Sequence, residues 1–197
     1  MNIQLLQKIV QKATNKQDLN WQIVDIFNFV RDIPYGDIWS RNPEDVYFNN
    51  KGTCSWKHEL LKSLYLFIWV EVKECVIIHH FRNLSVDFPE EIKLILDSED
   101  ILDPHNLLMI RLDEDWIKVD CTWDLPMKLL WFQVNENRDG KSDQKICVIQ
   151  EWEIMELNNA IKFKEDFIND LSILQREKRK LFLKKFTEWL DVWRNTN

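Results

Sequence analysis

Apolar side chains recur at helical spacing in three stretches of the first third of the chain. Residues 3–13 and 21–31 each place an apolar side chain every three or four positions, which is the spacing of one helix face. A third stretch begins at Cys54 and keeps its apolar residues on the side of Cys54 as far as Ile68. The pattern therefore predicts two N-terminal helices and a central helix with Cys54 in its first turn.

Segments rich in Val, Ile and Leu in the middle of the chain predict strands instead. Residues 72–81 form one such segment. Residues 105–112 and 115–123 form two more, and the two polar residues between them predict the tight turn of a hairpin. Further on, the pattern predicts a short strand over 145–150 and a long helix, in one or two pieces, over 158–194. We expect an α+β fold in which the central helix lies against an antiparallel sheet.

The composition is that of a globular protein, and it narrows the classes of partner. Of the 197 residues, 45% are hydrophobic and 30% are charged, and the formal net charge is -7. An acidic chain without a basic stripe is a poor candidate for binding nucleic acid or an anionic membrane surface. No apolar run is long enough to cross a bilayer. We expect one domain over residues 1–197, with a core at about 31–150, N-terminal helices over 1–32 and a C-terminal helical extension over 158–195.

The cysteines are scattered along the chain and show no CxxC spacing. They are Cys54, Cys75, Cys121 and Cys147. This distribution argues against a disulfide framework and favours a reducing, cytoplasmic location. Zinc binding by cysteine and histidine is a weak alternative, because His79 and His80 are neighbours on a strand and point to opposite faces. We expect no metal and no cofactor.

Cys54 occupies a helix start, where a thiol can be activated. Thr53 is the candidate N-cap, because its hydroxyl can accept from a backbone N–H one turn further on. The free N–H groups and the helix dipole at this end stabilise a thiolate and can hold a developing oxyanion. A free thiol has a pKa of ~8.5. A helix N-terminus lowers this pKa, and a histidine beside the thiol lowers it further. Taken alone, a cysteine on an apolar stripe is more simply explained as a small buried core residue.

A histidine and an aspartate on the predicted hairpin supply the groups that would activate Cys54. A tight turn between the strands places Leu107 opposite Asp120, and His105 is then the diagonal neighbour of Asp120 on the same face. A three-residue turn would place the two side chains on opposite faces. A carboxylate beside an imidazole orients the ring and stabilises the imidazolium, which in turn holds a thiolate. We expect the central helix to cover this face.

Taken in order, these motifs resemble the transglutaminase-like superfamily, whose members share a papain-like cysteine-proteinase core. The motifs are Gly52-Thr53-Cys54 at a helix start, His105 at a strand start, Val119-Asp120-Cys121-Thr122-Trp123, and the earlier Ile33-Pro34-Tyr35, which is similar to small prokaryotic members. The resemblance covers residues 31–124, roughly half of the chain. Asn106 stands where the family often has an aromatic residue. Nothing matches the extra domains of the calcium-dependent cross-linking enzymes, so calcium is not implied.

The resemblance implies cysteine-dependent acyl transfer, with Cys54 as nucleophile, His105 as base and Asp120 as the acid that orients it. The thiolate would attack an amide or ester carbonyl of a peptide or protein and form a thioester, which water or an amine would then resolve. The sequence does not separate a hydrolase from a transferase. We expect an aromatic loop after residue 36 to form one wall of a cleft. The candidate substrate-binding or oxyanion residues are Tyr35, Trp39, Trp56 and Trp123.

Several other interpretations stay open. His58 lies one helical turn after Cys54 and is an alternative base, while Lys57 either favours the thiolate or is a solvated lysine. Asp103 and Asp124 are expected to be solvated or capping carboxylates.

The C-terminal extension offers a different kind of function. Its basic segment 175–185 predicts a solvated helix face, and its apolar side predicts association with a partner or a second copy. The alternative to an enzyme is thus a non-catalytic protein-binding module that retains the same fold.

Overall fold

A four-stranded antiparallel sheet lies at the centre of the computed structural model, which describes residues 1–40 and 42–196. Its strands are β1 Val72–His80, β2 Leu102–Leu112, β3 Asp115–Val119 and β4 Met155–Leu157. The order across the sheet is β3-β2-β1-β4, and each neighbouring pair is antiparallel. The predicted α+β class is confirmed.

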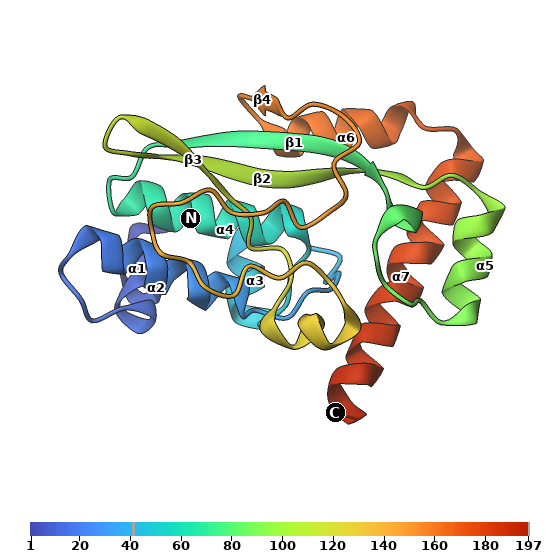
Figure 1. Cartoon of the computed structure of the whole chain (residues 1–197), viewed down its shortest axis with the longest axis horizontal. Helices are drawn as coiled ribbons and strands as arrows, with labels where there is room; N and C mark the ends of the chain where they lie inside the picture. Colours follow the sequence, from blue (N-terminus) through green and yellow to red (C-terminus); the bar gives the residue numbers. More distant parts are fainter. Residues whose placement is uncertain (41, 197) are drawn as a thin grey trace.

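Helices pack along this sheet and at one end of it (Figure 1). They are α1 Ile3–Ala13, α2 Leu19–Arg31, α3 Pro43–Asn49, α4 Cys54–Phe67, α5 Glu90–Ser98, α6 Ala160–Asp170 and α7 Ile173–Thr196, with short 3-10 turns at Phe81–Asn83 and Leu125–Leu130. Helices α1 to α4 lie on one side of the sheet, and α6 lies near β4 on the other (Figure 1). Helix α4 runs along the sheet beneath β2, with α1 and α2 on its outer side (Figure 1). Helices α5 and α7 stand side by side at the end of the sheet that lies away from α1 and α2.

The β2–β3 hairpin has the register that the sequence predicts. Leu112 pairs with Asp115 and Leu108 pairs with Val119 across a two-residue turn. Asp113 takes a positive φ of 53° in this turn, a conformation that aspartate tolerates. The strand β3 ends at Val119, earlier than predicted, so Asp120 lies just beyond the ladder.

The interior holds two hydrophobic clusters, a first one around Leu108 and a second one around Leu107 and Phe186. The central helix packs against the first cluster, although we expected it to cover the face of His105. The inner side of α4 packs with Leu108, Ile110 and the residues opposite them on β3. His105 is paired with Ile77 on the other face, which belongs to the second cluster. The body of α4 therefore does not cover the face of His105. Cys54, at the first position of the helix, belongs to the second cluster, so it lies where the two clusters meet.

Three other local predictions are wrong. The aromatic loop after residue 36 contains the helix α3, which begins at Pro43 with Asn42 as its N-cap. Residues 145–150 form no strand, and the fourth strand is β4 instead. Thr53 occupies the N-cap position of α4, but its side chain makes no capping hydrogen bond.

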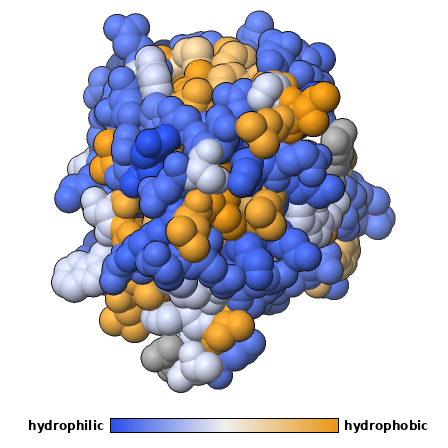
Figure 2. Space-filling model, turned by 90° about the vertical axis from the view of Figure 1, so that its right-hand side faces the viewer, coloured by the Kyte–Doolittle hydropathy of each residue, from blue (hydrophilic) through white to orange (hydrophobic). Residues whose placement is uncertain are grey.

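The C-terminal extension is helical, as predicted, and consists of two helices, of which α7 buries its apolar side within the chain. Phe182, Phe186 and Leu190 are fully buried in the second cluster, where Phe186 contacts Tyr35 and Trp123. Figure 2 views this end of the molecule, and it shows separate hydrophobic patches divided by hydrophilic residues. Association through this extension stays a prediction.

Candidate functional site

The thiol of Cys54 lies at the N-terminus of α4, between a cleft and the interior. The side chain is buried, with 3% of its surface exposed. The N–H groups of the first turn have no acceptor within the helix, because the intrahelical ladder begins with Lys57 N donating to Thr53 O. These donors and the helix dipole favour an anion at this end.

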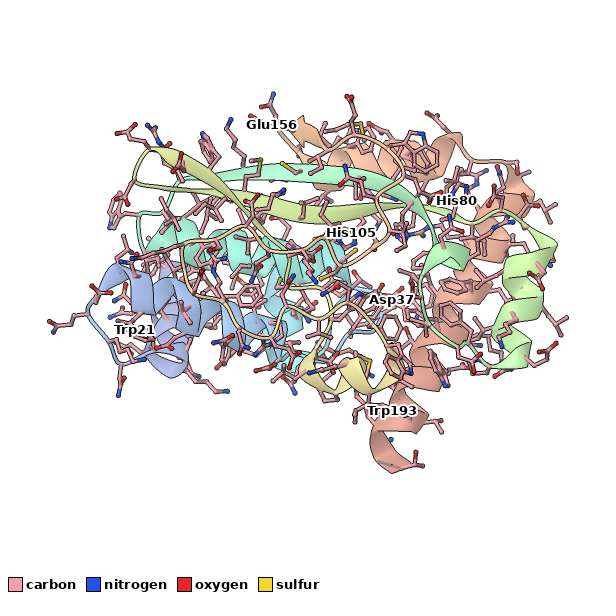
Figure 3. The ribbon with its side chains drawn as sticks, in the orientation of Figure 1. Trp21, Asp37, His80, His105, Glu156 and Trp193 are labelled. Carbon is pink, nitrogen blue, oxygen red and sulfur yellow. The ribbon has the colours of Figure 1, made fainter. Side chains whose placement is uncertain are left out.

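His105 and Asp120 meet behind Cys54, on the interior side. Nε2 of His105 lies 2.7 Å from Oδ2 of Asp120, and both side chains are buried. Because Nε2 is engaged by the carboxylate, Nδ1 is the nitrogen that remains to interact with Cys54, which lines the same small interior space as His105. Figure 3 shows His105 near the centre of the molecule, whereas His80 lies near the end of β1. The structure thus brings together the three predicted catalytic residues.

The carboxylate of Asp120 is fixed by its surroundings as well as by His105. Its Oδ1 accepts from the backbone N–H and the hydroxyl of Thr122, and its Oδ2 accepts from Cys147 N. Four donors around one buried carboxylate keep it ionised, and the pKa of Asp120 lies well below its usual range despite its burial. The end of the hairpin and the loop before residue 147 therefore hold the acid in place.

The charges of Cys54 and His105 depend on each other. Burial raises the pKa of the Cys54 thiol, but the charge of Lys164 and the interaction with His105 outweigh it and lower this pKa to about 7. Burial likewise lowers the pKa of His105, but Asp120 and Cys54 raise it to about 10. Between these values the arrangement favours a thiolate beside an imidazolium.

The other three cysteines have the opposite character. All four cysteines are free thiols. Burial raises the pKa of Cys75 to about 11 and that of Cys121 to about 12, and it raises the pKa of Cys147 well above its usual value. Reactivity toward electrophiles follows the thiolate, so Cys54 is set apart from the other three by its surroundings.

His58 lies close to the same groups, but both of its ring nitrogens contact backbone atoms. Cys121 N donates to its Nε2 at 3.1 Å, and its Nδ1 lies 2.7 Å from Cys54 O. The first contact makes Nε2 an acceptor, which places the proton of the neutral ring on Nδ1. Burial lowers the pKa of His58 to about 4, although Asp120 lies 3.5 Å from Nε2. With both nitrogens occupied, His58 is poorly placed to be the base.

A cleft of about 230 Å3 opens on the other side of Cys54. Its walls come from the segment before α3, the start of α4 and the helices α6 and α7. The lining includes Tyr35, Trp39 and Trp56, three of the four aromatic residues predicted to contact the substrate or the oxyanion. Trp123 does not line it: its ring is buried against Tyr35 and Phe132, and its Nε1 donates to Cys147 O.

A second charged group at Cys54 escaped the sequence analysis. Nζ of Lys164, on α6, lies 3.8 Å from Cys54 Sγ, 2.9 Å from Asp103 Oδ2 and 2.7 Å from Pro104 O. Arg179, on α7, donates from Nε to Asp103 Oδ1 at 2.8 Å. Asp103 is buried and ionised, with a pKa well below its usual range, so our expectation of a solvated carboxylate is wrong. The expectation of a fully solvated basic face on α7 is wrong at Arg179.

Lys57 and Asp124 are also buried, contrary to expectation, and both hold the surrounding segments together. Nζ of Lys57 donates to the backbone carbonyls of Arg31, Ile33 and Thr122. Its three donors are thereby occupied, so it is a structural residue and not a partner of the thiol. Asp124 accepts from Tyr35 N at 2.8 Å and pairs with Arg194 of α7.

Two further features bear on the classes of function. The described residues contain no group of three or more His, Cys, Asp or Glu side chains arranged to hold a metal ion. Within the same residues, every helix lacks the combination of length and apolarity that crossing a membrane requires.

Comparisons with known proteins find little that resembles this chain. A scan against protein-family models gives no match, and neither does a search of curated proteins. Among solved structures, the chain is similar to a protein from Cytophaga hutchinsonii described as a putative cysteine protease, with 15% sequence identity and a TM-score of 0.45. The similarity covers 64% of this chain and 39% of that protein.

Proposed function

We propose that this chain is a cysteine-dependent acyl-transfer enzyme that acts on an amide or peptide bond through a thioester on Cys54. The observation that carries the proposal is the placement of one thiol at a helix N-terminus beside an imidazole that is paired with a buried carboxylate. Nucleophile, base and orienting acid are the parts that covalent acyl transfer needs. The proposal includes a papain-like, transglutaminase-like core around α4 and the β2–β3 hairpin.

The chemistry follows from the charges at rest. The Cys54 thiolate attacks the substrate carbonyl carbon, the C–S bond forms and the carbonyl electron pair moves to oxygen. Collapse of this intermediate expels the amine, which takes a proton from Nδ1 of the His105 imidazolium. The neutral imidazole then removes a proton from water or from an acceptor amine, which attacks the thioester and releases Cys54. Asp120 keeps the ring oriented through both steps.

The oxyanion of each intermediate needs donors on the cleft side of Cys54. The first-turn N–H groups of α4 point out of the helix end and supply them. Tyr35 and Trp39 line the same cleft, but Tyr35 is almost completely buried while 60% of Trp39 is exposed. Trp39 and Trp56 are therefore the aromatic side chains best placed to contact the substrate.

One observation favours the alternative, a non-catalytic module that binds a protein and retains the fold. Only 3% of Cys54 is exposed, and His105 and Asp120 are buried behind it. In this alternative the aromatic cleft or the C-terminal extension holds a partner, and the thiol never reacts. The two functions differ in whether Cys54 forms a covalent bond.

The test is to trap an acyl group on Cys54. The protein is incubated with a library of fluorogenic peptidyl amides, with and without a primary amine, and the acid-quenched protein is mapped by mass spectrometry. We expect a hydroxylamine-sensitive adduct on Cys54 that is absent from Cys54→Ala and fails to form in His105→Ala. Cys75→Ala is the matched control, because it removes another buried thiol and should leave the adduct unchanged.

Alkylation by iodoacetamide distinguishes the alternative without a substrate. An enzyme of this kind predicts that Cys54 is labelled near neutral pH much faster than Cys75. If the native protein labels Cys54 no faster than Cys75 and no acyl adduct forms, the catalytic proposal fails and the binding module becomes the better interpretation.

A further inference from the structure

Asp103, Lys164, Arg179 and Cys54 form a charged cluster on the cleft side of the thiol. Asp103 lies on β2, two residues before His105, and holds Lys164 and Arg179 on its two oxygens. The side chains of both cations are 13% exposed, and that of Asp103 is 4% exposed. Lys164 makes two contacts with β2, to Asp103 and to Pro104 O, and its third neighbour is Cys54 Sγ. The contacts with Asp103 and Pro104 O thus hold the Lys164 ammonium against the sulfur of Cys54.

Among these four side chains, the formal charges balance when Cys54 is ionised. Lys164 and Arg179 contribute two positive charges, and Asp103 contributes one negative charge. The neighbouring pair of His105 and Asp120 is neutral by itself when the ring is an imidazolium. A cluster this deeply buried is costly with an uncompensated charge, and a thiolate at Cys54 supplies the missing negative charge.

We propose that Lys164 is a positioning residue for the nucleophile: it holds Cys54 as a thiolate independently of His105, with Asp103 and Arg179 fixing its place. His105 is then the group that moves protons, and Lys164 is the group that sets the charge of the sulfur. The C-terminal extension takes part in the site through α6 and α7.

Other charged or titratable groups face Cys54 and contribute to its ionisation. Asp103 opposes the thiolate, and Arg179 favours it from behind Asp103. Burial raises the pKa of the Cys54 thiol, and the charges of Lys164 and His105 outweigh this effect. The remaining neighbours are Tyr35 and Asp37 from the segment before α3, His58 from α4, His79 from β1, Cys121 after β3, and Glu165 from α6.

The role of Lys164 in turnover rests on the proposed function, but its effect on the thiol does not. During acylation the sulfur loses its charge to the carbonyl oxygen, and the charge of Lys164 then lies beside the new oxyanion. The ionisation of Cys54 can be measured without any substrate, so the two proposals can fail separately.

The experiment is the pH profile of iodoacetamide alkylation at Cys54, read by peptide mapping, in four proteins. They are the wild type, Lys164→Met, His105→Ala and the double variant. Methionine keeps most of the length and the apolar stem of lysine without its charge. Lys162→Met is the matched control, because Lys162 is exposed on the same helix and pairs with Asp166 away from Cys54. Circular dichroism and thermal unfolding report whether each variant is folded.

We expect each single variant to raise the midpoint of the profile above about 7 and the double variant to raise it to that of an ordinary thiol or higher. At pH 7, Lys164→Met should be alkylated roughly 5- to 10-fold more slowly than the wild type, the change that a midpoint moved by about one unit produces. Lys162→Met should match the wild type.

Two results would overturn the inference. One is a Lys164→Met profile that coincides with the wild type. The other is a His105→Ala profile that already has the midpoint of an ordinary thiol, because Lys164 by itself would then fail to hold Cys54 as a thiolate. The His105→Ala profile tests the role of Lys164 even if Lys164→Met does not fold, because His105→Ala retains Lys164. A shifted profile in a protein that transfers no acyl group would support the role of Lys164 while counting against the proposed function.

Discussion

The two sides of Cys54 are built alike but can do different chemistry. On the interior side, Asp120 holds the His105 ring against the sulfur, and on the cleft side Asp103 holds the Lys164 ammonium against it. Both carboxylates are buried, and both have a pKa well below the usual range. An imidazole can exchange a proton near neutral pH, whereas an ammonium in an ion pair keeps its charge. His105 is therefore suited to transferring a proton, whereas Lys164 is suited to setting the charge of the sulfur.

The largest expected effect comes from removing the charge of Asp120. In Asp120→Asn the neutral amide no longer stabilises the His105 imidazolium, so turnover of a substrate found with the peptidyl-amide library should fall by roughly 10^3- to 10^4-fold. Steady-state kinetics measures the change. Asp143→Asn is the control, because Asp143 forms a surface pair with Lys118. Turnover within about tenfold of the wild type would show that Asp120 is not needed to orient the His105 ring.

Removing the charge of Asp103 should act first on stability. Asp103→Asn leaves Lys164 and Arg179 without their carboxylate, and breaking a buried pair of this kind costs about 3–5 kcal/mol. Urea unfolding measures the loss. Asp100→Asn removes an exposed carboxylate that pairs with Arg82, and it should cost less than about 1 kcal/mol. Equal losses in the two variants would mean that the buried cluster is not a structural unit.

The two carboxylates together predict a loss of stability in acid. Their folded pKa values lie below the unfolded value of about 4, so the stability that they contribute is present above pH 4 and is lost as the pH falls below it. The free energy of unfolding, measured in urea from neutral pH downward, should therefore decline below about pH 4. A flat profile there would contradict the ionised state of both carboxylates.

The smallest expected effect on reactivity comes from His58. His58→Gln should cost about 1–2 kcal/mol of unfolding free energy, because it disturbs the contacts with Cys54 O and Cys121 N. The midpoint for alkylation of Cys54 should stay near 7, since the ring is neutral and occupied. A midpoint raised as far as in His105→Ala would make His58 the base and break the comparison.

Much of the interior side could be read from the sequence, because its determinants are local. The tight turn after Leu112 sets the register of the hairpin, and that register brings Asp120 next to His105. The start of α4 at Cys54 follows from the apolar spacing after it. The sequence could not show that the body of α4 would lie on the Leu108 face, because periodicity identifies apolar faces but not which of them meet.

The cleft side depends on contacts between residues that are far apart in the sequence. Lys164 is separated from Cys54 by 110 positions, and Arg179 lies on yet another helix. A lysine or arginine in a helix is most often solvated, so no local pattern marks the two that fold onto a buried carboxylate. Lys57 is a second example, since its three acceptors come from segments that meet only after folding. Short-range spacing controls the helix that begins at Cys54 and the hairpin that carries His105 and Asp120, so both could be predicted from the sequence. The charges around the thiol were decided by long-range packing, which places groups from distant helices in one buried space.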